Sequence, residues 1–507
     1  MRGQPSNNTA KSDRFSFLWL GIGTLLLVFA NGRWIFPLTT WLALIFVMRF
    51  LRKQKAARGL IIVSVAFLLV NIISWQGMIP VSSVIYYAIA AGIAGTYLLP
   101  FLADRLIVPR VNGFASTLVF PLVWATVEYL NSVVNPYATW CALAYTQYGC
   151  LPLVQLVSVT GLSGLTFLIT WFASVVNWIW EEDFRWPKIR PGIGIYAGIL
   201  AGILLLGGAR MVLFPSRSNT VRVGSVTASQ ILVSQFRQCV EKADWECVHK
   251  TSVELLDVLI EDSRLAAHAG AKIVFWQEYA GRMLMEDEEV SIERGKELAR
   301  KENIYLGMAL FTMTRAYPDE LGENKIIWIA PSGEVIAEYL KSRPVPGEPC
   351  IAGEGNIPVF DTPYGKIASV ICYDMDFPGL VRQAGQAGAD LMLVPAEDWK
   401  EVNLLHSHMA IFRAIENGFS LVRSTDQGMS VASDFQGQIL AALNQLTTEE
   451  RLMITDVPTR GVTTFYSRIG DLFAWLCIAG FLTITGWTVF HMSIHFKTRG
   501  ESMKINN

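Results

Sequence analysis

Three side chains that could do chemistry together each follow a short apolar run of the chain. Glu278 follows AKIVFWQ, Lys341 follows VIAEYL, and Cys372 follows KIASVI. A thiol needs a base to become the nucleophilic thiolate, and a carboxylate can take that proton. A tetrahedral intermediate needs a cation or N–H donors beside its oxyanion, and a lysine can supply the charge. The set therefore suits acyl transfer through a covalent cysteine adduct.

Each of these residues has a simpler explanation when it is taken alone. A cysteine in an apolar strand is most often a small core residue. A glutamate or a lysine after a strand is most often solvated. Their shared position at the ends of predicted strands favours the catalytic interpretation, because the active sites of layered α/β folds gather at the carboxyl ends of strands.

The elements that must position these residues belong to a stretch of soluble composition, residues 214–469. About 250 residues are enough to bury a full core. Neighbouring strands come in pairs between helices, which predicts a mixed layered sheet rather than one Rossmann unit. The expected strands are 221–227, 272–277, 304–313, 325–330, 335–340, 366–373, 391–395, 419–424 and 429–433. The expected helices are 247–268, 286–302, 378–388 and 403–417.

The rest of the chain has the composition of a membrane protein. Of the 507 residues 52% are hydrophobic and only 17% are charged, whereas soluble domains are roughly a quarter charged. The predicted organisation is a membrane domain of about seven helices over 1–213, the inserted domain 214–469, a last span 470–492 and a tail 493–507. The first seven expected spans are 15–31, 34–51, 59–77, 83–103, 114–133, 158–180 and 191–213.

Basic residues in the short loops predict the orientation of these spans. The loops expected to be cytoplasmic carry two or more lysines or arginines each, whereas the loops 78–82 and 134–157 carry none, and only Arg33 breaks the pattern. By the positive-inside rule, both termini lie in the cytoplasm and 214–469 lies outside. Residues 1–30 could also pass for a signal peptide that ends at Val28-Phe29-Ala30. Gly194, Gly198 and Gly202 share one helix face, which predicts close packing of a second helix there.

Several other partners and sites are disfavoured. A net charge of −1 argues against a nucleic-acid partner. No Cys or His group has metal-ligand spacing, and no Gly-rich phosphate loop is visible, so we expect neither a metal nor a cofactor. His406 and His408 are two residues apart, which predicts helix-surface or supporting residues. Cys239 and Cys247 are equally compatible with a disulfide and with two free thiols.

The reactive residues resemble the Glu-Lys-Cys triad of the nitrilase (carbon-nitrogen hydrolase) superfamily, whose fold is an αββα sandwich. Within it, a nitrilase domain inserted between the last two of eight membrane helices resembles the apolipoprotein N-acyltransferases. The matching segments are WQEYA, LKSRPVPGEP, ICYDMDFPGLVR and the membrane stretch 139–171. The resemblance therefore covers nearly the whole chain.

The resemblance implies a role for each residue of the site. Glu278 would deprotonate Cys372, while Lys341 and the backbone N–H of Tyr373 would hold the oxyanion. Glu348 stands at the position of an additional active-site Glu and is expected to be required. Asp374 stands where the family usually has Glu, and is expected to tolerate that change.

The implied reaction is a two-step acyl transfer at the outer face of a bacterial cytoplasmic (inner) membrane. A membrane phospholipid would donate a fatty acyl group to the cysteine, and the N-terminal amine of a diacylglyceryl lipoprotein would accept it. The catalytic domain would lie on the periplasmic side, with both substrates in the lipid bilayer.

Departures from the family pattern keep two alternatives open. The loop between Lys341 and Glu348 is one residue short, and the segments VPAEDWKE and TASQILVSQF differ from the usual form. These segments face substrate in the family, so a membrane-tethered amidase that passes the acyl group to water is one alternative. A non-catalytic membrane receptor or assembly factor on the same scaffold is the other, although an intact triad argues against it.

Overall fold

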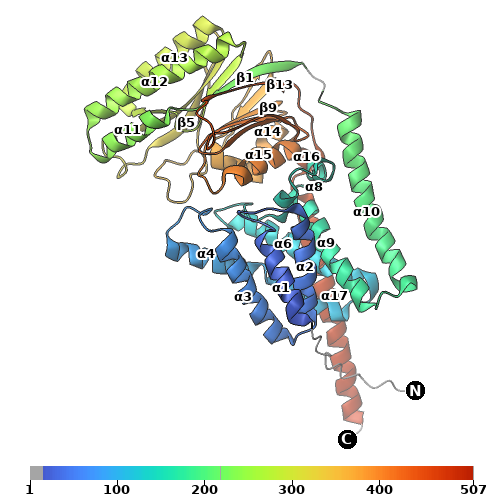
Figure 1. The fold of residues 1–507 in the computed structure, drawn as a ribbon. Coiled ribbons are helices and arrows are strands. Elements are labelled where there is room, and N and C mark those ends of the chain that lie inside the picture. Colours follow the sequence, from blue (N-terminus) through green and yellow to red (C-terminus); the bar gives the residue numbers. More distant parts are fainter. Residues whose placement is uncertain (1–14, 217–218, 506–507) are drawn as a thin grey trace. The chain divides into compact units, whose positions relative to one another are not determined.

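The computed structural model describes residues 15–216 and 219–505. They divide into two compact units (Figure 1). One unit holds the chain up to Leu156, Thr160–Leu206 and the residues from Asp471 onward; the other holds Val157–Val159 and Gly207–Gly470.

The first unit is helical. Six of its helical segments are long and apolar enough to cross a membrane, namely Ala56–Ser74, Ser83–Arg110, Gly113–Val134, Leu162–Glu181, Trp186–Leu213 and Leu472–His491. These six coincide with expected spans. The first two expected spans are shorter helices, α1 (Ser16–Val28) with 13 residues and α2 (Pro37–Arg52) with 16. A helix of 16 residues rises about 24 Å, less than a hydrocarbon core of about 30 Å.

The remaining helices that precede β1 (Thr220–Val226), and the last helix of the chain, have the following bounds. They are α3 (Ala56–Ser74), α4 (Ser83–Thr96), α5 (Leu99–Ile107), α6 (Val119–Val134), α7 (Leu151–Val154), α8 (Val157–Thr160), α9 (Leu162–Glu181), α10 (Trp186–Leu213) and α17 (Leu472–Ile505). We expected a second helix to pack closely on the glycine face of α10. In the structure no atom lies within 4 Å of a Cβ placed at Gly194, Gly198 or Gly202. No described helix packs closely there.

The second unit contains two sheets. The first has the order β13-β1-β2-β4-β5-β6, with β3 paired to β4, and the second has the order β12-β11-β10-β9-β8-β7. The strands of the first are β1 (Thr220–Val226), β2 (Ile273–Trp276), β3 (Gly281–Leu284), β4 (Tyr305–Met313), β5 (Glu323–Ile329), β6 (Val335–Leu340) and β13 (Leu452–Pro458). Those of the second are β7 (Val359–Thr362), β8 (Gly365–Ser369), β9 (Leu391–Glu397), β10 (Ser420–Asp426), β11 (Met429–Ser433) and β12 (Ile439–Asn444).

Helices cover the outer faces of both sheets, which gives four layers in the order αββα (Figure 1). α12 (Trp245–His268) and α13 (Glu288–Glu302) pack on the first sheet, and α15 (Asn403–Asn417) packs on the second beside α14 (Pro378–Gln386). The smaller helices are α11 (Gln230–Glu241) and α16 (Phe465–Ile469). Figure 1 shows α12 and α13 side by side on the outside of the sandwich. The expected fold class is confirmed.

The apolar patterning explains which face of each element is buried. β2 is buried at all four positions, and β9 at six of seven, as expected for parallel strands covered on both sides. α12 buries one stripe that includes Leu255, Leu256 and Leu259 against the first sheet. Cys239 and Cys247 form a disulfide between α11 and α12, so the first of the two possibilities raised by the sequence is the one observed.

Candidate active site

Cys372 lies at a tight turn between a strand and a helix. β8 ends at Ser369, four residues earlier than the expected strand 366–373, and Cys372 instead opens a 3-10 helix that runs to Asp376. The φ angle of Cys372 is 47°, in the left-handed region that L-residues seldom adopt. A non-glycine residue in that region costs of order 1–3 kcal/mol and is typical of functional positions. The residue at this turn is buried.

Glu278 and Lys341 form a buried ion pair at the ends of two strands of the first sheet. Glu278 comes two residues after β2, and Lys341 directly follows β6. The Lys341 Nζ lies 2.8 Å from Glu278 Oε1, and both residues are 1% exposed. A buried ion needs a partner to remain charged, and these two provide it for each other.

Glu348 completes this cluster from the loop that follows Lys341. Its Oε2 lies 2.9 Å from Lys341 Nζ, and its Oε1 accepts hydrogen bonds from the hydroxyl of Tyr279 and from Asn324 Nδ2. Asn324 also donates to Glu278 Oε1 at 2.7 Å. The two carboxylates therefore share one lysine and one amide.

The backbone of Glu397, at the end of β9, connects the cluster to the cysteine. Its N–H donates to Glu278 Oε2 at 2.8 Å, and its carbonyl oxygen lies 3.7 Å from Cys372 Sγ as an acceptor for the thiol. One residue on the second sheet thus contacts both the carboxylate of Glu278 and the thiol of Cys372. The structure brings together all three residues that the sequence singled out.

The electrostatics of the cluster separate the roles of its members. Burial raises the pKa of Glu278, and Lys341 opposes that shift. Burial also disfavours the ionised form of Glu348, but Lys341 and Tyr279 still hold the pKa of Glu348 below its usual range. Burial and the carboxylate of Glu278 raise the pKa of the Cys372 thiol well above its usual value. The resting thiol is therefore neutral, and Glu278 is the more basic of the two neighbouring carboxylates.

Asp374 joins the cysteine turn to the segment after Lys341. Its carboxylate accepts hydrogen bonds from the backbone N–H groups of Ile371 at 3.2 Å, Ser342 at 3.4 Å and Arg343 at 2.8 Å, and from the Tyr339 hydroxyl at 2.9 Å. Tyr373 is buried, and its ring packs edge-on against Phe377 at 5.3 Å. The Tyr373 side chain therefore belongs to the packing of the turn.

A second buried charge network lies on another side of Cys372. His406 Nδ1 lies 2.7 Å from Asp398 Oδ1, and its Nε2 lies 3.0 Å from Asp376 Oδ2. Arg423 binds both oxygens of Asp398 at 2.7 and 2.8 Å. Burial opposes a charge on His406, but the carboxylates of Asp376 and Asp398 raise the pKa of its imidazole to about 9. His406 is 2% exposed, so of the two interpretations that the sequence allowed, it is a supporting residue and not a helix-surface one.

Cys372, Asp398 and His406 each offer a potential metal-ligand atom, and these atoms lie within 4.8 Å of one another. Their existing contacts fit an ion-pair network better than a metal site. Both ring nitrogens of His406 already face carboxylates, and both oxygens of Asp398 already bind Arg423.

Sequence reasoning missed Asn324, Tyr279, the Glu397 peptide and the His406 network. Tyr279 carried a usable signal, because it directly follows Glu278 at a predicted strand end. In the structure its φ of 59° marks a second left-handed turn. Asp398 directly follows the end of a buried strand, which was also readable. Asn324 lies inside β5, and its direction toward Glu278 depends on the pairing of β4 with β5.

Comparison with known proteins divides the chain in the same way as its composition. A family model described as Carbon-nitrogen hydrolase matches residues 222–465. A family model described as Apolipoprotein N-acyltransferase N-terminal domain matches residues 23–175.

Three similar proteins, each named Apolipoprotein N-acyltransferase, cover most of the chain. One from Geobacter metallireducens is 28% identical over 413 residues, 76% of each chain. One from Shewanella oneidensis is 25% identical over 402 residues, 73% of each chain. One from Haemophilus influenzae is 25% identical over 504 residues, 90% of this chain and 92% of the relative. Among solved structures, an amidase from Nesterenkonia sp. has a TM-score of 0.40 and 23% identity, covering 50% of this chain and 95% of its own.

Proposed function

We propose that this chain, which belongs with the apolipoprotein N-acyltransferases, moves a fatty acyl group in two steps through Cys372. It carries both an N-terminal domain of that family and a carbon-nitrogen hydrolase domain. The donor is a membrane phospholipid, and the acceptor is the N-terminal amine of a diacylglyceryl-cysteine lipoprotein. The names of the relatives support acylation of lipoproteins. Nothing in the comparisons favours the amidase or the non-catalytic receptor.

In the first half-reaction, Glu278 takes the proton of the Cys372 thiol, and the sulfur attacks the carbonyl carbon of an acyl ester. The tetrahedral oxyanion is stabilised by the Lys341 ammonium and by the backbone N–H of Tyr373. Collapse breaks the ester C–O bond, and the proton held by Glu278 passes to the leaving oxygen. The products are a lysophospholipid and an acyl thioester on Cys372.

In the second half-reaction, the lipoprotein amine attacks the thioester carbonyl. Glu278 accepts a proton from the nitrogen, the C–S bond breaks, and that proton returns to the sulfur. The products are an amide and the free thiol. No external energy source is needed, because an ester and an amine become an alcohol and an amide.

The observation that carries this proposal is the contact of the backbone of Glu397 with both Glu278 and Cys372. It supports Glu278 as the base and Cys372 as the nucleophile, because both side chains contact the same residue. The ion pair of Glu278 with Lys341, both buried, supports a cation at the same place. Glu348 and Asn324 would hold Lys341 and Glu278 in position.

We propose the bacterial inner membrane as the location, with the catalytic domain on the periplasmic side. The charge pattern of the loops supports this orientation. Arg2, Lys11 and Arg14, which contribute to it, lie outside the described residues.

The test is transfer by the purified full-length protein in phospholipid micelles. A diacylglyceryl-cysteine peptide should gain one amide-linked acyl group, and the same peptide with an acetylated α-amine should gain none. Cys372→Ala should lose the reaction, while Cys150→Ala, which removes an exposed free thiol, should keep it. Release of free fatty acid or of ammonia from simple amides, without acylation of the peptide, would favour a hydrolase instead.

A further inference from the structure

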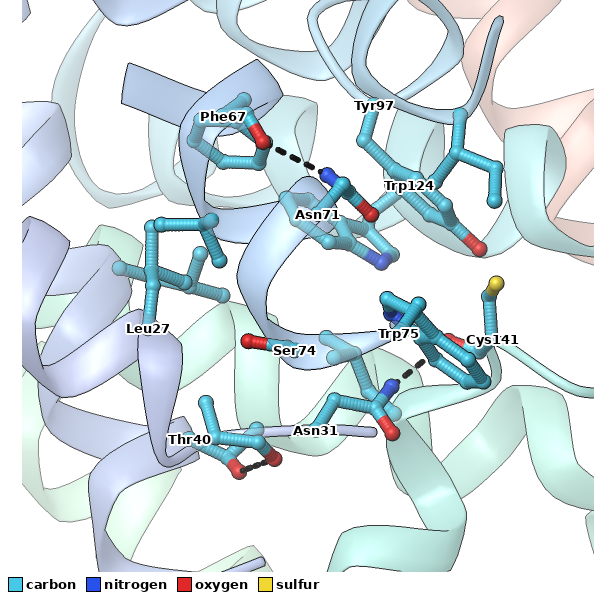
Figure 2. Close-up of a pocket in the computed structure, with 15 residues that line it drawn as sticks. Leu27, Asn31, Thr40, Phe67, Asn71, Ser74, Trp75, Tyr97, Trp124 and Cys141 are labelled. Carbon is cyan, nitrogen blue, oxygen red and sulfur yellow. Dashed lines mark hydrogen bonds between the residues drawn. The ribbon is translucent and has the colours of Figure 1, made fainter. Parts of the chain in front are cut away.

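The helical unit has a small cavity among α1, α2, α3, α4 and α6 (Figure 2). Its volume of about 70 Å³ is well below the roughly 300–1,000 Å³ of sites that bind small molecules. On its wall, Asn71 Nδ2 donates to the Phe67 carbonyl at 2.8 Å (Figure 2). The cavity is too small for an acyl chain, and no ligand is proposed for it.

Glu397, whose backbone contacts both Glu278 and Cys372, is also held by its side chain. Its Oε2 lies 3.0 Å from Arg282 Nη2, and its Oε1 lies 2.8 Å from Arg237 Nη2. The side chain of Arg282 is only 8% exposed, whereas that of Arg237 is 49% exposed. Because water and salt weaken an exposed ion pair, Arg282 is the stronger of the two anchors.

Arg282 and Glu397 come from different sheets. Arg282 belongs to β3, which pairs with β4 of the first sheet, and Glu397 ends β9 of the second sheet. Glu278 follows β2 of the first sheet, and Cys372 follows β8 of the second. The ion pair therefore joins the two sheets through the residue whose backbone contacts the candidate base of one sheet and the candidate nucleophile of the other.

Arg282 also contacts Tyr279, which holds Glu348. The guanidinium carbon of Arg282 lies 5.3 Å from the centre of the Tyr279 ring, within the range of a cation–π contact. The Tyr279 hydroxyl donates a hydrogen bond to Glu348, and Glu348 lies 2.9 Å from the ammonium of Lys341. One guanidinium group therefore contacts both Glu397 and a residue that supports the Lys341 cluster.

The two segments that depart from the family pattern meet at this carboxylate. Glu397 lies in VPAEDWKE, and Arg237 directly follows TASQILVSQF. Gln230, inside the second segment, donates a hydrogen bond to Asp426, the residue paired with Glu397 between β9 and β10. The two departures are therefore matched to each other by direct contacts.

Loss of the Arg282 guanidinium would leave the Glu397 carboxylate with Arg237. The Glu397 side chain is only 15% exposed, and a largely buried carboxylate that loses a partner is costly. It would therefore follow Arg237 toward water. Because the Glu397 backbone contacts both Glu278 and Cys372, this movement would displace the base and the nucleophile together. A misplacement of about 1 Å can slow a reaction by about 10²-fold.

We propose that Arg282 is a positioning residue for the reaction at Cys372, and that it acts by holding Glu397 so that the Glu397 backbone keeps Glu278 and Cys372 in place. The inference rests on the proposed cysteine chemistry. Arg282 acts through Glu397 rather than on the substrate, so its loss should lower the rate of attack and leave ester binding unchanged.

The test measures the first acylation of Cys372 by p-nitrophenyl butyrate in the purified full-length protein. The thiol sulfur attacks the ester carbonyl while Glu278 takes the thiol proton, nitrophenolate leaves with the electron pair of the C–O bond, and a butyryl thioester remains. This burst of nitrophenolate needs neither phospholipid nor lipoprotein, and Cys372→Ala should lack it. The burst amplitude counts folded sites, whereas the burst rate reports how well the base and the nucleophile are placed.

Arg282→Met should lower the maximal burst rate by about tenfold, and leave the amplitude and the half-saturating ester concentration unchanged. Arg282→Lys, which keeps the charge, should recover most of the rate. Arg315→Met is the matched control, because Arg315 also pairs with a glutamate, Glu286, but is 58% exposed; it should react like wild type. Arg237→Met, at the exposed partner of Glu397, should lose about twofold or less.

Glu397→Gln tests the same link with a milder change, which keeps the length of the side chain and removes its charge. It should also lower the burst rate at constant amplitude, whether or not Arg282→Met folds. Adding it to Arg282→Met should cause no further loss, because both changes remove one ion pair, whereas independent effects would multiply.

An Arg282→Met protein that keeps the wild-type burst rate, or that loses amplitude alone, would overturn the positioning role and leave the proposed reaction standing. Multiplied losses in the double variant would overturn it as well, since Arg282 would then act by a route other than Glu397. If wild type gives no burst beyond that of Cys372→Ala, the cysteine chemistry itself fails, and this inference fails with it.

Discussion

Cys372 and Tyr279 both have a left-handed backbone, and the carboxylate of Glu278 and the thiol of Cys372 both contact the backbone of Glu397. Burial raises the pKa of both the Cys372 thiol and the Glu278 carboxyl group, its candidate base. A neutral thiol beside a buried carboxylate does not react until a substrate excludes water and a cation receives the developing charge. Reactivity at rest is therefore expected to be low.

We expect a graded loss of transfer across the cluster. Cys372→Ala should have no measurable transfer, and Glu278→Gln and Lys341→Ala should each be slower by about 10²–10³-fold, the cost of losing a proton acceptor or one oxyanion donor. Glu348→Gln should lose less, because Glu348 contacts Lys341 rather than the thiol. Steady-state acylation of the peptide measures the series, and size-exclusion profiles check the fold. Turnover by Cys372→Ala at the wild-type rate would contradict covalent catalysis.

His406 supplies a prediction about stability and pH. Its pKa is raised to about 9 in the folded protein, above a value near 6.5 when unfolded, so the folded state binds the proton more tightly. The stabilisation is present in full below about pH 6.5 and disappears as the pH rises through 9, a loss of no more than about 3 kcal/mol. Thermal unfolding of wild type should show this decline, and His406→Gln should lack it. His249→Gln, at an exposed histidine, should decline like wild type; a flat wild-type profile would contradict the prediction.

At the scale of elements, the site depends on segments from both sheets. β2 and β6 carry Glu278 and Lys341, β8 leads into the cysteine turn, and β9 ends at the Glu397 peptide. Asp374 ties the cysteine turn to the segment after β6. Asp398, held by Arg423 and His406, anchors the chain one residue beyond Glu397.

The tie at Asp374 changes the expectation for Asp374→Glu. The sequence comparison suggested tolerance, but three backbone N–H groups and one hydroxyl already surround this carboxylate. A longer side chain must shift the cysteine turn or the Lys341 segment. We expect transfer to fall by about tenfold or more while the thermal midpoint changes little, measured by peptide acylation and by calorimetry. An unchanged rate would show that the turn adapts to the longer acid.

Local pattern predicted most central strands and the edge strand β6, and missed the edge strands β7, β12 and β13, for a physical reason. β4 and β9 are continuous apolar runs that are buried on both faces. The edge strands β7 and β12 have almost no buried residue, so no apolar signal marks them. β13 pairs with β1 across more than half of the inserted domain, which no local signal reports.

The residues of the site likewise divide into those that a local sequence pattern could identify and those that it could not. Glu278, Lys341 and Cys372 were accessible because strand ends and residue types are local properties. The contacts of His406 were not, because a spacing of two residues from His408 says nothing about which helix face meets Asp376 and Asp398. That face is fixed by the packing of α15 on β10 and β11.

At the scale of the whole molecule, the orientation of the chain in the membrane remains a prediction. A reporter fused after Arg217 should be active outside, and one fused after Lys497 should be active inside, because the basic loops lie on one side. Alkaline phosphatase and green fluorescent protein fusions read the two compartments in opposite ways. A cytoplasmic location of the fusion after Arg217 would reverse the topology and separate the site from periplasmic lipoproteins.

The central claim is that Cys372 carries the acyl group between the two lipid substrates, and intact-mass spectrometry tests it most directly. The purified protein is incubated with phospholipid and no acceptor. Because a transferase must protect its acyl-enzyme from water, the protein should gain the mass of one fatty acyl group. Neutral hydroxylamine should release that group, a diacylglyceryl-cysteine peptide should discharge it, and Cys372→Ala should never acquire it. A protein that stays unmodified while it acylates the peptide, or an adduct that persists in Cys372→Ala, would contradict the account.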